Sequence, residues 1–87
     1  MFYVYILLSK RDDYLYIGYT NNLIRRFKMH NEGKVLSTRL RRPFKLIYYE
    51  AYLAKNDAIL REKFFKTGWG RNYIQRNLKE TLIEAKI

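Results

Sequence analysis

Cysteine is absent from the 87 residues, and proline, histidine and tryptophan occur once each. The absence of cysteine excludes a disulfide framework, a thiolate metal site and a cysteine nucleophile, so packing must hold the fold together. No apolar run is long enough to cross a bilayer, and residues 1–9 lack the basic lead and cleavage site of a signal peptide. We therefore expect a cytoplasmic protein without a membrane partner.

Acidic residues are also scarce, with 8 Asp and Glu against 18 Lys and Arg. The formal net charge of +10 points to a polyanionic partner, and nucleic acid is the leading candidate. No linker or internal repeat interrupts the sequence, which predicts a single domain over residues 1–87 with no obligate protein partner. A domain of this size buries roughly two-thirds of its unfolded surface, so its core is thin.

Three segments have the composition of β-strands. Residues 2–8 and 14–18 are rich in β-branched and aromatic side chains, and the turn-like residues 10–13 separate them, which predicts a β-hairpin. Residues 44–52 form the third predicted strand, since five of these nine residues are aromatic or β-branched. Pro43 fits immediately before it.

Three helices are predicted between and after these strands. Asn21 or Asn22 caps the first, which should fray near residues 31–33. Asn56 or Asp57 caps the second, over about residues 58–67, and Gly68 would end it in the left-handed conformation. The third is an amphipathic helix marked by apolar residues at positions 74, 78 and 82. The order β-β-α-β-α-α predicts an α+β fold, a sheet covered by helices.

Two aromatic motifs, Tyr3-Val4-Tyr5 and residues 16–18 (Tyr-Ile-Gly), begin an ordered series of polar residues. Thr20, Arg26, His30 and Glu62 follow them. The order and spacing resemble the GIY-YIG nuclease superfamily, whose pattern Y-I-G-x-T-x-x-L-x-x-R-x-x-x-H fits residues 16–30. The resemblance covers nearly the whole chain and is closest to small free-standing members. It implies a three-stranded antiparallel sheet flanked by helices, and nuclease activity.

Arg26 and His30 are four residues apart and so share one face of the first predicted helix. Phosphodiester cleavage requires stabilisation of negative charge on the phosphoryl oxygens, which the planar guanidinium of Arg26 can provide. The alternative is a solvated arginine, the expected state of Arg25. His30 has an unperturbed pKa near neutrality and is a candidate acid or base, and the alternative is a helix-end cap. Related nucleases have tyrosine at this position, which favours a positioning role.

Glu62 is the candidate metal ligand, lying beside the apolar stripe of the second predicted helix. The helical pattern alone favours the alternative of an ion pair with Lys66 at i+4, and the resemblance reverses that ranking. A single carboxylate suffices for Mg²⁺, which keeps several waters and is completed by substrate phosphate oxygens. Mn²⁺ is the other candidate cofactor.

Tyr5 and Tyr16 lie on adjacent predicted strands, where cross-strand packing is the ordinary role of aromatic residues. The resemblance implies that one of them activates or orients the attacking water, and we favour Tyr5 over Tyr16. An unperturbed tyrosine, with a pKa of about 10, is a poor base at neutral pH. Gly18 and Thr20 are supporting residues, and Gly18 would allow close approach of substrate or form a bulge at the strand end.

Basic residues are concentrated between positions 34 and 45, where no acidic residue occurs. We expect phosphate contacts there, with a solvated patch as the alternative. The predicted nucleic-acid-binding residues are Lys34, Arg39, Arg41, Arg42, Lys45 and Arg71. Trp69 either stacks on a base or braces the C-terminal helix, and bracing is preferred.

Two positions depart from the family pattern. Tyr3 stands where the name-giving motif has glycine, and Ile74 stands where some family enzymes have asparagine, with Asn72 two residues earlier.

Three functions are considered. The first is a metal-dependent endonuclease acting on DNA, with branched or damaged DNA and repair as candidates. The second is a non-catalytic nucleic-acid-binding module. The third is a small basic protein associated with RNA or the ribosome. Retention of the principal motif residues ranks the first above the second, and the ordered spacing of the motif ranks both above the third.

Overall fold

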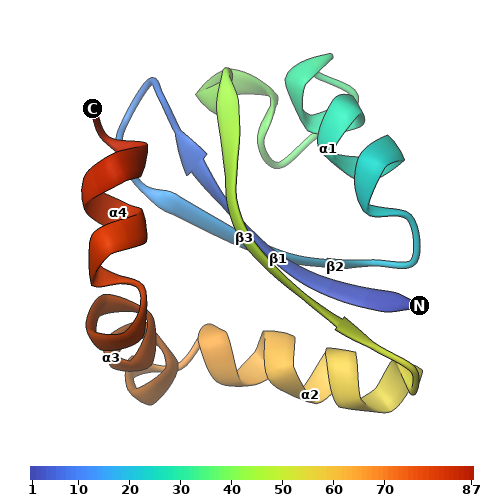
Figure 1. The fold of residues 1–87 in the computed structure, drawn as a ribbon. Helices are drawn as coiled ribbons and strands as arrows, with labels where there is room; N and C mark the ends of the chain where they lie inside the picture. The colour runs from blue at the N-terminus through green and yellow to red at the C-terminus, as the bar shows by residue number, and fades with distance from the viewer.

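A computed structural model describes residues 1–87 and confirms the α+β class (Figure 1). Three strands and four helices follow one another in the order β-β-α-β-α-α-α. The elements are β1 (Phe2–Ser9), β2 (Leu15–Thr20), α1 (Leu23–Asn31), β3 (Phe44–Tyr52), α2 (Lys55–Phe65), α3 (Gly68–Asn77) and α4 (Lys79–Ala85), with a short 3₁₀ turn at Arg39–Arg41. None of the helices is long and apolar enough to span a membrane.

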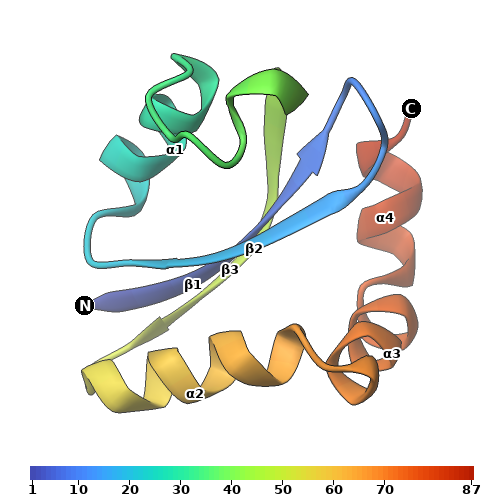
Figure 2. The same cartoon turned by 180° about the vertical axis from the view of Figure 1, so that it is seen from behind.

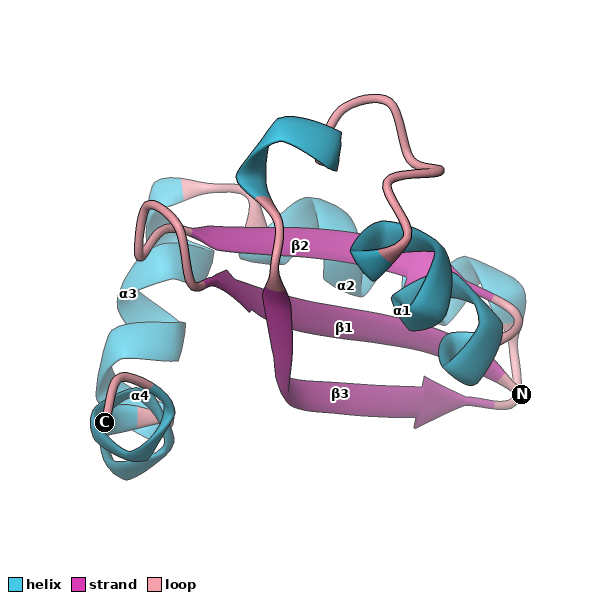
Figure 3. Ribbon diagram, turned by 90° about the horizontal axis from the view of Figure 1, so that it is seen from above, coloured by secondary structure: helices cyan, strands magenta, loops and turns pink.

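The three strands form one antiparallel sheet in the order β2-β1-β3. β1 is the central strand, and residues 4–9 of it are almost fully buried. Helix α1 lies on one side of the sheet, and α2 and α3 lie on the other (Figures 1 and 3). Because side chains alternate along a strand, successive residues of β1 supply two different cores.

The larger core lies between the sheet and the three C-terminal helices. Val4 and Ile6 of β1 pack there with Phe65 of α2, Ile74 of α3 and Leu82 of α4. The smaller core lies under α1. Its buried members are Tyr5, Leu7 and Phe44, with Leu23 and Phe27 of α1 packed against them. Helix α1 therefore covers the motif residues that face this side of the sheet.

The predicted cap of the first helix is confirmed. The side-chain oxygen of Asn22 accepts a hydrogen bond from the backbone N–H of Arg25 at 3.1 Å, which satisfies one of the free donors of the first turn. The helix ends at Asn31, and Gly33 follows with a φ of 76°. Glycine adopts this left-handed conformation without the steric cost of a Cβ atom.

The predicted bounds of the later helices were wrong. Helix α2 begins at Lys55 after Ala54, so Asn56 and Asp57 lie inside its first turn and do not cap it. Gly68 does not end α2 in the left-handed conformation but begins α3. The reason is that the Thr67 hydroxyl accepts a hydrogen bond from the Gly70 N–H at 3.1 Å, which starts a new helix.

The single third helix of the prediction is two helices in the structure, α3 and α4. The chain departs from helical geometry at Leu78, with φ of −115° and ψ of 27°. The apolar spacing did not reveal this break because Ile74 and Leu82 pack in the same core on either side of it. Hydrophobic periodicity reports which residues face the core and is unchanged by a bend between them.

Candidate functional site

Tyr5 and Gly18 face each other across β1 and β2. The Tyr5 phenol ring lies over Gly18, where an added Cβ atom would come within 2.8 Å of Cε1 and nearer still to Cζ and Oη. The pairing of β1 with β2 is regular through Gly18, so the expected bulge is absent. Glycine at this position makes room for the Tyr5 ring.

His30 of α1 lies behind Tyr5 and has no exposed surface. Its Nε2 is 2.8 Å from the Tyr5 hydroxyl, and its Nδ1 is 2.7 Å from the hydroxyl of Thr38. Burial, with a smaller effect of the Arg26 charge, lowers the pKa of His30 to about 4. The imidazole is therefore neutral at neutral pH, with one nitrogen donating and the other accepting. His30 has no surface with which to touch a substrate directly.

The Tyr5 side chain is 1% exposed. Burial raises the pKa of Tyr5 to about 12, although the nearby Arg26 guanidinium opposes the shift and the charges of Tyr16 and Glu62 add to it. The hydroxyl is thus protonated at neutral pH, and the lowering of pKa that a basic role would need is not present in the free protein.

Arg26 of α1 carries an unused hydrogen-bond donor. Its Nε is buried and has no partner. A buried donor without a partner costs free energy comparable to a lost hydrogen bond, so such groups are rare in folded proteins. Arg26 lines a hollow of about 210 Å³ with Thr20, Asn22 and Arg25. This hollow, with its two arginines, is suited to an anion.

Glu62 of α2 makes the ion pair that the helical pattern favoured, with Lys66 Nζ at 3.1 Å from its Oε2. The Glu62 side chain is 22% exposed and that of Lys66 54%, so the pair is open to water. No cluster of three or more histidine, cysteine or acidic side chains is present. A metal ion at Glu62 would have one protein carboxylate, which fits Mg²⁺ completed by waters and phosphate oxygens.

A cavity of about 480 Å³ runs along the free edge of β2. Tyr16 lies on this edge strand, which Figure 2 shows between α1 and α2. The half-buried Tyr16 ring is 5.0 Å from that of His30 and 6.3 Å from that of Tyr5, measured between centroids. Across the cavity lie Lys66 and Arg71. Tyr16 therefore joins the buried Tyr5–His30 pair to an accessible cationic cavity.

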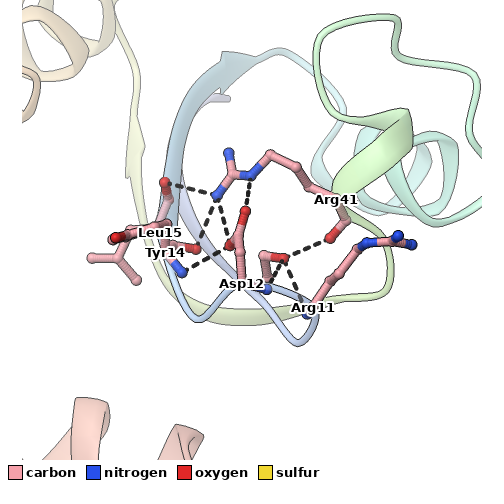
Figure 4. Close-up of polar contacts among 6 residues, drawn as sticks. Arg11, Asp12, Tyr14, Leu15 and Arg41 are labelled. Atoms are coloured by element: carbon pink, nitrogen blue, oxygen red, sulfur yellow. Dashed lines mark hydrogen bonds and ion pairs between the residues drawn. The ribbon is translucent and has the colours of Figure 1, made fainter.

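The predicted phosphate-binding residues differ in how free their side chains are. Arg41 is engaged within the fold, because its Nε is 2.7 Å from an oxygen of Asp12 and its Nη2 donates to the Tyr14 carbonyl at 3.1 Å (Figure 4). The hydrogen bonds from Arg41 lower the pKa of Asp12 to about 2. Arg41 thus fastens the 3₁₀ turn to the β1–β2 turn, a contact that spacing along the sequence does not reveal.

The other basic residues have fewer partners. Lys34 pairs with Glu32 at 3.4 Å, and Arg42 donates from Nε to the Arg39 carbonyl at 2.7 Å. Arg39 and Lys45 are exposed and form no ion pair. The exposed cations of this segment are available for phosphates.

Three residues singled out in α3 differ in their exposure. Trp69 is 81% exposed, so the preferred role of bracing the C-terminal helix was wrong. Leu82 and Ala85 are the buried residues that hold α4. Ile74 is buried in the larger core, and Asn72 points away from it and is exposed. Asn72 therefore does not take the place of an asparagine at position 74.

Sequence reasoning did not include Thr38 in the site, although it is fully buried and positions the His30 imidazole. A threonine in a basic loop carries no local signal for this role. Lys66 was considered only as a partner of Glu62, and its place in the cavity beside Tyr16 depends on the packing of α2 against the sheet.

Comparison with known proteins identifies relatives along the whole chain. A family model described as the GIY-YIG catalytic domain matches residues 1–75. A UPF0213 protein of Bacillus licheniformis is 45% identical over 85 residues, covering 97% of this chain and 80% of the relative. A UPF0213 protein of Clostridium perfringens is 45% identical over 87 residues, covering 99% and 86%. The solution NMR structure of a UPF0213 protein from Bacillus halodurans matches with 38% identity and a TM-score of 0.47, covering 99% of this chain and 86% of that one.

Proposed function

Because the chain belongs to the GIY-YIG catalytic-domain family and to its small UPF0213 proteins, we propose that it is a divalent-metal-dependent endonuclease that hydrolyses DNA phosphodiester bonds. The observation that carries the proposal is the buried Arg26 Nε, which has no partner in the free protein. A phosphoryl oxygen bound in the hollow that Arg26 lines would satisfy this donor once the Arg26 side chain turns toward it. The planar guanidinium would then stabilise the negative charge that develops during cleavage.

Tyr16 is the tyrosine that contacts the attacking water in this proposal. It lines the cavity, whereas Tyr5 is almost fully buried. Tyr5 is a positioning residue held by neutral His30. When Nδ1–H of His30 donates to Thr38, Nε2 accepts from the Tyr5 hydroxyl, whose oxygen keeps lone pairs free to orient a neighbour. The order of the two tyrosines favoured from sequence is thereby reversed.

Glu62 is the proposed ligand of Mg²⁺ or Mn²⁺, and either ion would supply Lewis-acid stabilisation of the phosphoryl oxygens. The ion pair with Lys66 must open for the carboxylate to act as a ligand. Because the pair is exposed to water, the cost of opening it is small, about 0.2–1 kcal/mol. Lys66 would then be free to contact a phosphate in the cavity.

The exposed basic side chains are proposed to contact the DNA backbone. Arg39, Arg42 and Lys45 are exposed near the 3₁₀ turn, and Arg71 lines the cavity beside Tyr16. Backbone contacts carry no direct sequence information and release counterions. DNA affinity should therefore fall steeply with salt and show little base preference.

The test is cleavage of labelled duplex, single-stranded, flap and branched DNA with Mg²⁺, Mn²⁺ or chelator. Wild type is compared with Glu62→Gln and with the matched variant Glu32→Gln, which changes an exposed glutamate at the end of α1. We expect metal-dependent cleavage that Glu62→Gln abolishes and Glu32→Gln retains, with DNA affinity at least as high as that of wild type in both, because each substitution frees a lysine. Cleavage that survives Glu62→Gln, or absence of cleavage from every substrate, would contradict the proposal.

A non-catalytic nucleic-acid-binding module is the second candidate. Two observations favour it, namely that Lys66 neutralises Glu62 and that the pKa of Tyr5 is raised. This candidate predicts DNA or RNA binding that needs no metal and is unaffected by Glu62→Gln. The same panel separates the two functions, since only the endonuclease gives a metal-dependent product.

A further inference from the structure

Trp69 is displayed on a rigid part of the fold. It lies in the first turn of α3 and is followed by Gly70, where a Cβ atom would collide with the backbone of Phe64 and Phe65. The Thr67 hydroxyl caps the same turn through the Gly70 N–H at 3.1 Å. The backbone that carries Trp69 is thus fixed against the end of α2, and the ring itself remains exposed.

A cavity of about 340 Å³ adjoins the Trp69 ring. Phe64 and Tyr73 supply further aromatic surface, and Asn72 and Arg76 supply amide and guanidinium groups. Phe64 and Tyr73 pack edge to face with centroids 5.9 Å apart, which holds Tyr73 in place. The cavity therefore combines flat aromatic surfaces with hydrogen-bonding groups, and its only charge is positive.

An unpaired nucleobase has the chemistry to occupy such a cavity. Base faces stack on aromatic side chains, base edges pair with amides, and the attached phosphate attracts arginine. Helix α3 contains no acidic residue, and the chain carries a net charge of +10. This charge favours a polyanion over a protein segment as the occupant.

The geometry points to the Trp69 cavity as a stacking site for an unpaired base in a single-stranded part of the DNA substrate. The inference rests on the proposed function in taking DNA as the substrate. Arg71, Ile74 and Gln75 of the same helix line the cavity beside Tyr16, so α3 separates the stacking site from the candidate catalytic cluster. An α-helix is about 10 Å across, a distance that a few nucleotides span. Single strands that leave a duplex, as in flaps and branches, are the favoured substrates.

The experiment uses the fluorescence of Trp69, which is the only tryptophan. The Glu62→Gln protein is titrated without metal with single-stranded oligonucleotide and with a blunt duplex hairpin, and the anisotropy of labelled DNA reports total binding. We expect single-stranded DNA to quench the fluorescence with the midpoint seen by anisotropy, and the duplex to quench it weakly. Because neither readout needs cleavage, failure of the proposed catalysis and failure of the stacking site remain distinguishable.

Substitutions complete the test by anisotropy. Trp69→Ala should weaken single-strand binding by about 5- to 150-fold, the usual effect of removing one stacking ring, and should change duplex binding less than about twofold. Trp69→Phe should restore most of the affinity. Leu60→Ala, which changes an exposed apolar residue of α2, is the control and should have no effect. Equal weakening of both DNAs, unchanged single-strand binding in Trp69→Ala, or binding without quenching would overturn the inference.

Discussion

Replacing Gly18 by alanine tests the local geometry on which the site depends. The added Cβ would fall among Cε1, Cζ and Oη of Tyr5, in a strand where the backbone is fixed by pairing with β1. The phenol ring must move, because a buried aromatic ring is less costly to displace than a paired strand. Its displacement breaks the hydrogen bond to His30 and exposes the smaller core.

The expected loss of stability follows from three effects. Overpacking of a buried site costs about 1–3 kcal/mol. Loss of the hydrogen bond between Tyr5 and His30 adds about 0.5–1.5 kcal/mol. Alanine has lower chain entropy than glycine in the unfolded state, which offsets about 0.5–1 kcal/mol of the lost stability. The free energy of unfolding should fall by about 2–3 kcal/mol, equivalent to roughly 10–20 °C in Tm for a domain of this size.

Urea unfolding followed by circular dichroism measures the change, and Gly68→Ala is the matched control. Gly68 lies in the first turn of α3, and a Cβ added there meets no atom within 4 Å. The control should be neutral or stabilised by up to about 0.5 kcal/mol, because alanine has the higher helix propensity. Equal stability of the two variants would refute the placement of the Tyr5 ring over Gly18.

Three further predictions concern charges. Lys66→Ala frees the Glu62 carboxylate, so Mn²⁺ affinity measured by titration of its paramagnetic signal should rise about two- to fivefold. His30 has a pKa of about 4 when folded and about 6.5 when unfolded. As the pH falls, the unfolded state therefore binds the proton at a higher pH than the folded state does. The free energy of unfolding should thus fall as pH drops from about 6.5 to 4, by at most ~3 kcal/mol, and NMR should show His30 neutral at pH 5. Arg41→Ala should lower the free energy of unfolding in urea by about 1–2 kcal/mol, and Arg39→Ala by less than about 0.5.

Each of these predictions has a control and a contradictory result. Lys63→Ala changes an exposed α2 lysine outside the ion pair, so an equal gain in Mn²⁺ affinity would exclude specific competition by Lys66. A histidine resonance that titrates near pH 6.5 would show that His30 is not buried. Equal loss of stability in the Arg41 and Arg39 variants would contradict the Asp12 contact.

Local chemistry explains what the sequence predicted correctly. The third strand has the predicted bounds, because the aromatic and β-branched residues between Phe44 and Tyr52 fit a pleated surface. The Asn22 cap was recognised because its partner, the Arg25 N–H, lies three residues away. Signals of this kind act within one helical turn or one strand.

Features that depend on distant contacts were missed or wrongly interpreted. Gly18 was read as a possible bulge because the ring that needs its space, that of Tyr5, lies on another strand. The contact of Arg41 with Asp12 spans 29 residues. The pKa values of Tyr5 and His30 are set by burial, which residue spacing does not specify. The candidate residues were therefore identifiable from sequence, but their division into accessible and positioning groups was not.

The most direct test of the central claim compares two neighbouring arginines. Arg26 carries the buried unpartnered Nε, and the exposed Arg25 lines the same hollow. Single-turnover cleavage at saturating DNA is measured for Arg26→Ala and Arg25→Ala, with DNA affinity measured in parallel. The account predicts that Arg26→Ala lowers the rate by about 10²–10³-fold with affinity nearly unchanged, and that Arg25→Ala weakens binding but retains the rate. Equal rates for the two variants would contradict it.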